Sequence, residues 1–213
     1  MNPGLVAVGD SIVNGHGDSM AGVPALSWAQ WLADAMDLSY TRYARGGATS
    51  SEIVADLLPR VRGRYAVGVF NMGTNDALKG LEVDLFESNV RTTAKTLADV
   101  CNRVVVLTVP ISAEATRVIE KVAAETGAIV VDSTVRSLRL LTPDGVHPTT
   151  LGHLAIADRA AIALGAPLPS ALARNGGRGR LGAAYRFRYA VGVARSAAKQ
   201  AVKRAIRTTT PVR

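Results

Sequence analysis

Short apolar runs alternate along the chain with longer stretches in which apolar residues recur every three or four positions. The short runs are rich in β-branched, aromatic or other apolar residues, which indicates strands, and they lie at 5–8, 39–43, 65–70, 104–109 and 128–131. The longer stretches have helical spacing and lie at 26–36, 51–62, 81–102, 113–126 and 149–164. Because strands and helices alternate, the pattern predicts an α/β fold, a three-layer α/β/α sandwich around a five-stranded parallel sheet.

The loops that follow the predicted strands hold the residues with candidate chemistry. These loops span 9–14, 45–50, 71–77, 110–112 and 132–148. In parallel sheets, ligands bind at the carboxyl ends of the strands, where such loops meet. We therefore expect a functional site to be assembled from them.

Two of these loops together contain the parts of a serine hydrolase. Ser11 follows the first strand in a Gly-Asp-Ser turn, and Asp144 and His147 lie three residues apart in the last loop. A serine hydroxyl becomes a good nucleophile when an imidazole takes its proton and a carboxylate orients the imidazole. Each segment alone has a simpler explanation, since Asp10 or Ser11 can cap a helical turn and an Asp-x-x-His pair can merely close a loop. Their combination predicts a Ser-His-Asp triad.

Two further loops contain groups that can stabilise an oxyanion. Gly46 and Gly47 allow a backbone N–H to approach a substrate without a side chain in the way. Asn75, in the run from Gly73 to Asp76, offers an amide donor at the end of the third strand. The alternatives are an ordinary glycine turn and an Asx turn capped by Asn75 or Asp76. Beside a serine nucleophile, the oxyanion role is favoured for Asn75.

Four segments of the chain occur in the order of the sequence blocks of one enzyme family. They are V-G-D-S at 8–11, A-R-G-G-A-T at 44–49, G-T-N-D at 73–76 and D-G-V-H-P at 144–148. They resemble blocks I, II, III and V of the SGNH hydrolases, also called GDSL esterases and lipases, and the resemblance covers about residues 4–164. It implies a flavodoxin-like sandwich that hydrolyses acyl esters without a cofactor. No histidine shows the spacing of a metal site.

The resemblance gives each motif residue a role by its position. It implies that Ser11 is the nucleophile and first oxyanion donor, that Gly47 and Asn75 are the other donors, that His147 is the base and that Asp144 orients it. We expect further substrate contacts from Asp10, Gly46, Asp76 and His16. The second block departs from the family pattern, because Arg42 and Tyr43 stand where an Asn usually precedes the Ala. Gly46 therefore remains an alternative to Gly47.

The predicted function is hydrolysis of a small-molecule or lipid carboxylic ester through an acyl-enzyme. An acyltransferase acting on a sugar or another alcohol would use the same triad, and a catalytically idle scaffold is the alternative without chemistry. The segment 14–31 is expected to form the rim of the pocket, where Trp28 and Trp31 would favour an apolar acyl or aryl group. Alternatively, these tryptophans belong to the core.

The positive charge is concentrated near the C-terminus. The chain has 213 residues and a formal net charge of +8. Residues 1–173 hold 14 basic and 17 acidic residues, whereas residues 174–213 hold 11 basic residues and no acid. A run rich in Gly and Arg then predicts a flexible linker. We therefore divide the chain into a hydrolase domain at 1–170, a flexible basic linker at 171–182 and a basic amphipathic helical tail at 183–213.

The tail has a small-residue face and a basic face. The first carries Phe187, Ala190, Val191, Ala194, Ala198, Ala201 and Ala205, and the second carries Arg188, Arg195, Lys199, Lys203 and Arg207. Such a helix at 183–207 can lie on an anionic membrane. Non-specific nucleic-acid binding is less favoured, and a solvated or partner-bound helix is the remaining alternative. The sequence sets no oligomeric state.

Cysteine content and apolar run lengths bear on the compartment. Cys101 is the only cysteine, so nothing requires an oxidising compartment. Leu5 to Val8 is too short for the apolar core of a signal peptide, and no apolar stretch approaches the roughly 20 residues of a membrane span. We expect a cytoplasmic protein with peripheral contact at the inner membrane surface.

Overall fold

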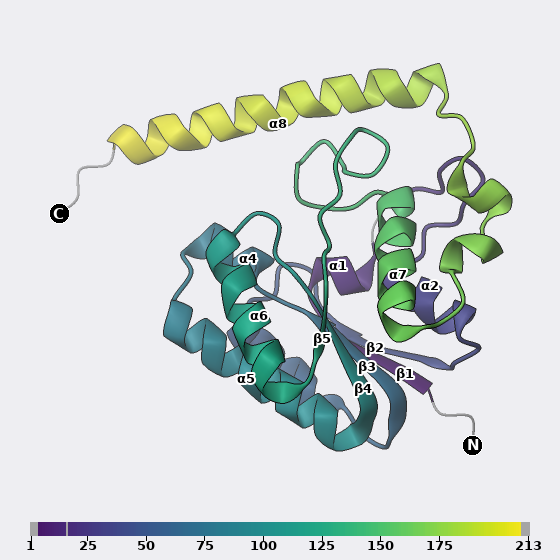
Figure 1. Ribbon diagram of the computed structural model, residues 1–213. Coiled ribbons are helices and arrows are strands. Elements are labelled where there is room, and N and C mark those ends of the chain that lie inside the picture. The colour runs from purple at the N-terminus through teal and green to yellow at the C-terminus, as the bar shows by residue number, and fades with distance from the viewer. Residues whose placement is uncertain (1–3, 16, 210–213) are drawn as a thin grey trace.

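The computed structural model describes residues 4–15 and 17–209, and within them five strands form one parallel sheet (Figure 1). The strands are β1 (Gly4–Gly9), β2 (Tyr40–Ala44), β3 (Tyr65–Asn71), β4 (Cys101–Leu107) and β5 (Ile129–Val131). Their spatial order is β2-β1-β3-β4-β5, and every neighbouring pair is parallel. This is the flavodoxin-like order, so the predicted fold class is confirmed.

Helices cover both faces of the sheet because the strands are apolar on both sides. On β1, Leu5 and Ala7 face one layer, and Val6 and Val8 face the other. The first layer contains α2 (Trp28–Ala35) and α7 (Thr150–Leu164), and the second contains α5 (Val83–Val100) and α6 (Ala113–Thr126). The second layer also includes α3 (Ser50–Glu52), a π-helical turn at Ile53–Leu57 and a 3-10 turn at Leu58–Arg60.

The start of β4 and the helix α4 are among the features that differ from the prediction. β4 begins at Cys101, three residues before the predicted strand at 104–109, because Cys101 pairs with Tyr65 of β3. The apolar spacing of the same residues also fits the end of the predicted helix at 81–102. Residues Thr74–Lys79 form helix α4 where the sequence predicts a loop. This helix is too short and too polar for apolar periodicity to reveal it. Gly73 precedes it with a φ of 107°, a conformation that glycine adopts without strain.

The segment between α7 and the C-terminal helix packs against the domain. It contains 3-10 turns at Pro169–Leu172 and Arg174–Gly177, and Pro169, Ala173 and Gly177 are buried. The Arg139 guanidinium donates to the carbonyls of Gly177 and Gly179. These residues form packed turns, whereas the sequence predicts a flexible linker from residue 171. The turns are held because their small apolar side chains pack against α2 and α7.

The last helix, α8 (Ala183–Thr209), runs across the loop between β5 and α7 at the top of Figure 1. Among the helices of the described ranges, none has both the length and the apolar character that crossing a bilayer requires.

Candidate active site

Ser11 begins a four-residue helix directly after β1. The Asp10 carboxylate caps this helix, α1 (Ser11–Asn14), by accepting a hydrogen bond from the Ile12 N–H at 2.9 Å. The cap holds Ser11 at the carboxyl edge of the sheet, where it is 8% exposed. The two interpretations of this turn are therefore compatible, since the turn that Asp10 caps is the one that presents Ser11.

The loop 142–148, termed the His147 loop, is closed at its base by backbone contacts. Leu141 and Pro148 form an antiparallel bridge, and the Thr142 N–H donates to the His147 carbonyl at 2.8 Å. Within the loop, the Gly145 N–H donates to the Thr142 carbonyl at 3.1 Å. These bonds fix the path of the loop independently of the His147 side chain.

The His147 loop places an imidazole between Ser11 and Asp144. Ser11 Oγ lies 2.8 Å from His147 Nε2, and His147 Nδ1 lies 2.7 Å from Asp144 Oδ2. An ionised carboxylate only accepts hydrogen bonds, so Nδ1 carries the proton that faces Asp144 and Nε2 accepts from the Ser11 hydroxyl. The structure thus brings together three residues that the sequence predicts from its two ends.

Hydrogen bonding sets the titration of both His147 and Asp144. Burial opposes ionisation of Asp144, but hydrogen bonds from His147, Thr142 and Val146 outweigh it and hold the Asp144 pKa well below its ordinary value. The bond to Asp144 raises the pKa of His147, against the effect of burial. Asp144 therefore stays ionised at neutral pH and stabilises positive charge on the imidazole.

Asp10 is wholly buried behind the site. Its Oδ1 accepts from the Asn71 amide at 2.6 Å, and its Oδ2 accepts from the Asn75 amide at 3.4 Å. Burial is the main cause that raises the Asp10 pKa to about 6. The predicted substrate contact by Asp10 is therefore wrong, because a carboxyl with no exposed surface supports Ser11 and the two asparagines from behind.

Asp76 connects the loops after β2 and β3. Its carboxylate accepts from the Ser50 N–H at 3.0 Å and from the Ser50 hydroxyl at 2.6 Å. Asn89 on α5 donates to Ser50 Oγ at 2.9 Å. Both carboxylate oxygens are engaged by Ser50, and the predicted substrate contact by Asp76 stays a prediction. Neither Ser50 nor Asn89 is predicted from the sequence as a site residue; a polar side chain on the buried face of α5 is the signal for Asn89.

Asn75 and the glycine turn lie beside Ser11. The Asn75 amide donates to the Ala48 carbonyl at 2.9 Å, which ties it to that turn. A Cβ at Gly46 would lie 4.0 Å from Ser11 Cβ, whereas a Cβ at Gly47 would have no neighbour within 4 Å. Neither glycine N–H donates to another residue in the part of the chain described. Both are therefore available to a substrate, and Gly46 makes the closer approach to Ser11.

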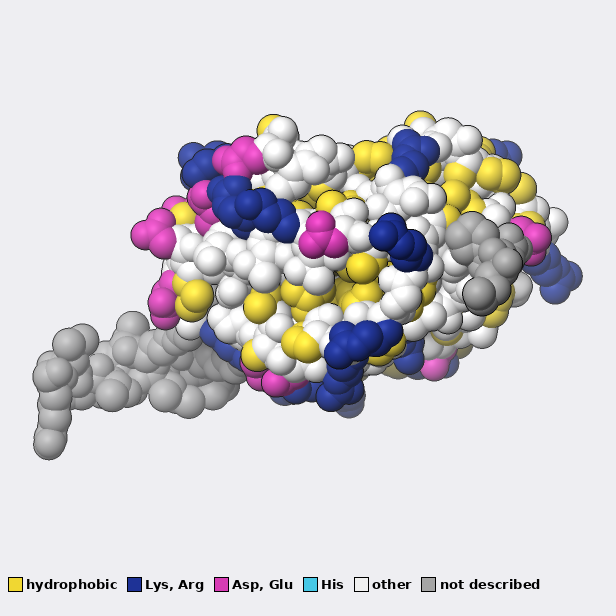
Figure 2. Space-filling model, turned by 90° about the horizontal axis from the view of Figure 1, so that it is seen from below, with side chains coloured by type: hydrophobic (Ala, Val, Ile, Leu, Met, Phe, Trp, Pro, Cys, Tyr) yellow, Lys and Arg dark blue, Asp and Glu magenta, His cyan; other side chains and the backbone are white. Residues whose placement is uncertain are grey.

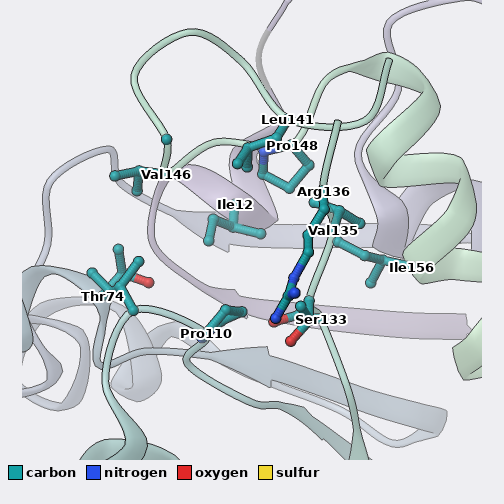
Figure 3. Close-up of a pocket in the computed structure, with 13 residues that line it drawn as sticks. Ile12, Thr74, Pro110, Ser133, Val135, Arg136, Leu141, Val146, Pro148 and Ile156 are labelled. Atoms are coloured by element: carbon teal, nitrogen blue, oxygen red, sulfur yellow. The ribbon is translucent and has the colours of Figure 1, made fainter. Parts of the chain in front are cut away.

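A cleft of about 220 Å³ is lined by residues that flank Ser11 and His147 in the sequence (Figure 3). Its lining includes Ile12, Thr74 and Val146, which are sequence neighbours of Ser11, Asn75 and His147. Figure 3 shows these side chains surrounding the same space, together with residues of the loop that follows β5. The cleft is therefore a candidate binding site for part of a substrate.

The predicted aromatic rim is not present. Trp28 and Trp31 are both buried in the first layer, so the core interpretation is correct for each. Residues 17–20 line a separate hollow against α8, and His16 lies outside the described residues. Within the described ranges, no three His, Cys, Asp or Glu side chains are grouped so that they could hold a metal ion.

Comparisons with known proteins agree with this geometry. The model of the GDSL-like lipase/acylhydrolase family matches residues 7–155, and no curated protein matches the chain. The psychrotrophic esterase EstA from Pseudoalteromonas sp. has a TM-score of 0.61 at 17% identity, over 77% of this chain and 97% of that chain. The enzyme LAE5 from the metagenome of Lake Arreo has a TM-score of 0.61 at 18% identity, over 76% and 95%. The acetylxylan esterase Axe2 from Geobacillus stearothermophilus has a TM-score of 0.56 at 15% identity, over 76% and 94%.

At such identities the solved structures establish the fold alone, and the family rests on the sequence match over most of the domain. The chain therefore belongs to the GDSL-like lipase/acylhydrolase family.

Proposed function

We propose that this protein hydrolyses carboxylic esters through an acyl-enzyme on Ser11. The observation that carries the proposal is the continuous hydrogen-bonded chain from Ser11 Oγ through His147 to Asp144, at 2.8 and 2.7 Å. Family membership supports hydrolysis, and the esterases among its structural neighbours favour an ester as the bond that is cleaved.

In the proposed reaction, Ser11 Oγ attacks the ester carbonyl while its proton passes to His147 Nε2. Asp144 stabilises the imidazolium that forms. His147 then gives the proton to the leaving alcohol oxygen, the bond between that oxygen and the acyl carbon breaks, and the acyl-enzyme remains. A water molecule next gives a proton to His147 and attacks the acyl carbon. The carboxylic acid departs, and the proton returns to Ser11 Oγ.

The charge that develops on the carbonyl oxygen requires donors that are in place before attack. In this proposal the donors are the N–H groups of Ser11 and Gly47 and the Asn75 amide, with Gly46 as the alternative glycine. The Asn75 amide makes a close bond to Ala48 and a longer one, 3.4 Å, to Asp10. The hydrogen that faces Asp10 is therefore the one that can turn to the oxyanion.

An organophosphate ester tests the nucleophile directly. Diethyl p-nitrophenyl phosphate should transfer its diethylphosphoryl group to Ser11 Oγ with loss of p-nitrophenolate, and mass spectrometry should place one adduct on the peptide that contains Ser11. The structural neighbour EstA is described as inhibited by monoethylphosphonate, which favours this class of probe. Ser88→Ala is the matched control, because Ser88 is exposed on α5 and does not line this cleft.

The proposal requires that Ser11→Ala abolish both the adduct and the hydrolysis of p-nitrophenyl esters, while Ser88→Ala keeps them. Labelling of Ser11→Ala at the wild-type rate would place the nucleophile elsewhere. A wild type that neither forms the adduct nor cleaves any ester from acetate to palmitate would contradict esterase activity and favour a scaffold.

A further inference from the structure

Among the described residues that line the cleft near Ser11, Arg136 is the one that carries a charge. The remaining described lining is mostly apolar and includes Ile12, Val135 and Ile156. Figure 3 shows the Arg136 side chain descending along the wall of the cleft toward Ser133 and Pro110. An arginine here presents a fixed positive charge to whatever group enters.

The charge of Arg136 is not neutralised by a neighbouring acid. Its guanidinium has no hydrogen bond or ion pair with any residue of the described ranges. Asp132, the nearest acid in sequence, accepts from the Thr134 N–H at 2.8 Å and lies 3.9 Å from Arg159. Asp144 is hydrogen-bonded to His147. The cleft therefore combines apolar walls with one unpaired guanidinium, a group suited to bidentate pairing with a carboxylate or phosphate.

We propose that the cleft binds esters whose non-reacting end carries an anionic group, a carboxylate or a phosphate, and that Arg136 pairs with that group while Ser11 reaches the ester carbonyl. This inference rests on the proposed esterase activity. The apolar walls take the carbon chain between the two ends. Arg136 itself is exposed to solvent, so its pairing with the anionic group should weaken as salt rises.

Matched ester pairs test the proposal. The mono-p-nitrophenyl ester of adipic acid and p-nitrophenyl hexanoate have the same chain length and leaving group and differ only in a terminal carboxylate. Arg136→Gln should lower the ratio of kcat/KM for the anionic over the neutral ester at least tenfold and leave the neutral ester within about twofold, as expected for one lost charge-assisted pair. Arg117→Gln, the same change at an exposed position of α6, should leave the ratio unchanged.

A third ester, which ends in a phosphate, distinguishes the two anions. The ester whose anion Arg136 prefers should show the larger drop in kcat/KM when Arg136 is replaced by Gln. Arg136→Glu should invert the preference toward the neutral ester. Hydrolysis of both esters with a ratio that Arg136→Gln does not move would overturn the role of Arg136 while leaving the esterase intact. Failure of the wild type to hydrolyse any of the esters would instead overturn the proposed function.

A second, independent observation concerns α8, which contacts the His147 loop with one side only. The Tyr185 hydroxyl donates to the Leu138 carbonyl at 2.8 Å. A Cβ at Gly192 would lie 2.7 Å from Pro143 Cγ, so the helix touches the loop that carries His147. Tyr185, Gly192 and Ser196 are spaced along the same helical face and are partly buried.

The outer face of α8 is apolar and is bordered by basic residues. Phe187 is 71% exposed, and Ala190, Ala194 and Ala198 continue the same exposed face. Beside this face lie three exposed cations, Arg188, Arg195 and Lys199. The opposite side of the molecule is different, since Figure 2 shows dark blue and magenta side chains mixed there.

We infer that α8 lies on an anionic lipid surface, with Phe187 entering the interface and the three cations at the level of the headgroups. A second copy of the chain is a poor occupant, because residues 174–213 contain 11 basic residues and no acid, so two such helices repel. A nucleic acid would bind the cations through its phosphates and would leave the exposed Phe187 side chain without an apolar partner. Because α8 contacts Pro143, the lipid surface lies next to the proposed active site.

Vesicle sedimentation of the full chain tests this inference. Phosphatidylglycerol vesicles should retain the protein, with binding that weakens as salt rises, and phosphatidylcholine vesicles should not. Replacing Arg188, Arg195 and Lys199 together with Gln should weaken binding at least tenfold, whereas the same change at the exposed residues Arg64, Lys95 and Arg117 should have less than a twofold effect. Phe187→Ser should weaken vesicle binding but not retention on a DNA duplex.

Equal loss in both triple variants would overturn the specific role of α8. Wild-type vesicle binding by Phe187→Ser, together with tight duplex binding, would assign the helix to nucleic acid. A concentration-dependent dimer of the wild type that Phe187→Ser dissolves would assign the face to a second copy.

Discussion

His147→Ala is expected to lower kcat for ester hydrolysis by about 10⁵-fold. Without the imidazole, the Ser11 hydroxyl loses the proton acceptor that lies 2.8 Å away. The fold should persist, because the backbone bond between Thr142 and His147 and the bridge between Leu141 and Pro148 do not use the imidazole. Steady-state kinetics with p-nitrophenyl acetate, together with an unchanged Tm, would separate lost chemistry from lost structure.

Asp144→Asn extends the same experiment to the pH profile. His147 acts as a base only when neutral, so wild-type kcat/KM should rise as pH increases through the His147 pKa, which the bond to Asp144 raises above 6.5. The variant loses that effect, so its inflection should move to lower pH, and its plateau should fall by about 10⁴-fold because the imidazole tautomer is no longer fixed. Asp99→Asn on the exposed side of α5 should change neither quantity. An unaltered profile in Asp144→Asn would show that Asp144 does not orient His147.

Gly152→Ala is expected to destabilise the domain by about 3 kcal/mol, at the upper end of the cost of overpacking. Helix α7 passes so close to the base of the His147 loop that a Cβ at Gly152 would overlap the Leu140 carbonyl oxygen and lie 2.9 Å from Pro148 Cβ. The obstacle is backbone, so no side-chain rotation relieves it. The Leu140 carbonyl also accepts the Thr149 N–H at 2.9 Å, and a shift would break that bond. Thermal denaturation should show a Tm lower by roughly 6–12 °C.

Gly182→Ala is the control for this prediction, since a Cβ there meets nothing within 4 Å. Its free energy of unfolding should stay within about 0.5 kcal/mol of the wild type. Because the displaced loop carries His147, Gly152→Ala should also lose activity at temperatures where it remains folded. Equal stability of the two variants would show that α7 and the loop can separate at little cost.

The strands and the contacts among Ser11, His147 and Asp144 could be predicted because both leave local signals in the sequence. Each strand is a short apolar run, and Ser11 follows the first of them in a Gly-Asp-Ser turn. Asp144 and His147 share one short loop, so their contact required no knowledge of the fold. Only the meeting of Ser11 with that loop depended on topology, and a parallel sheet supplies it by collecting the loops at one edge.

The polar contacts behind the triad could not be predicted, since they join positions with no sequence relation. Asp10 meets Asn71, 61 positions away, and Asp76 meets Ser50, 26 positions away. Both carboxylates lie after strands, where a substrate ligand would also lie, and it is their hydrogen-bond partners in the structure that show them connecting loops. The burial of Trp28 could not be predicted for a related reason. Helical spacing identifies the apolar face of α2 but does not say whether that face packs on the sheet or lines the pocket.

The hydrogen bond between Ser11 and His147 joins residues that are 136 positions apart. Closing so long a stretch of chain is entropically costly, and contacts of this kind slow folding when they must form early. β1 can pair with β2 and β3 before residues near His147 take part, so Ser11 can lie in a formed sheet before His147 reaches it. Recovery of the proposed ester hydrolysis during refolding should therefore report the completion of folding, whereas recovery of secondary structure reports its onset.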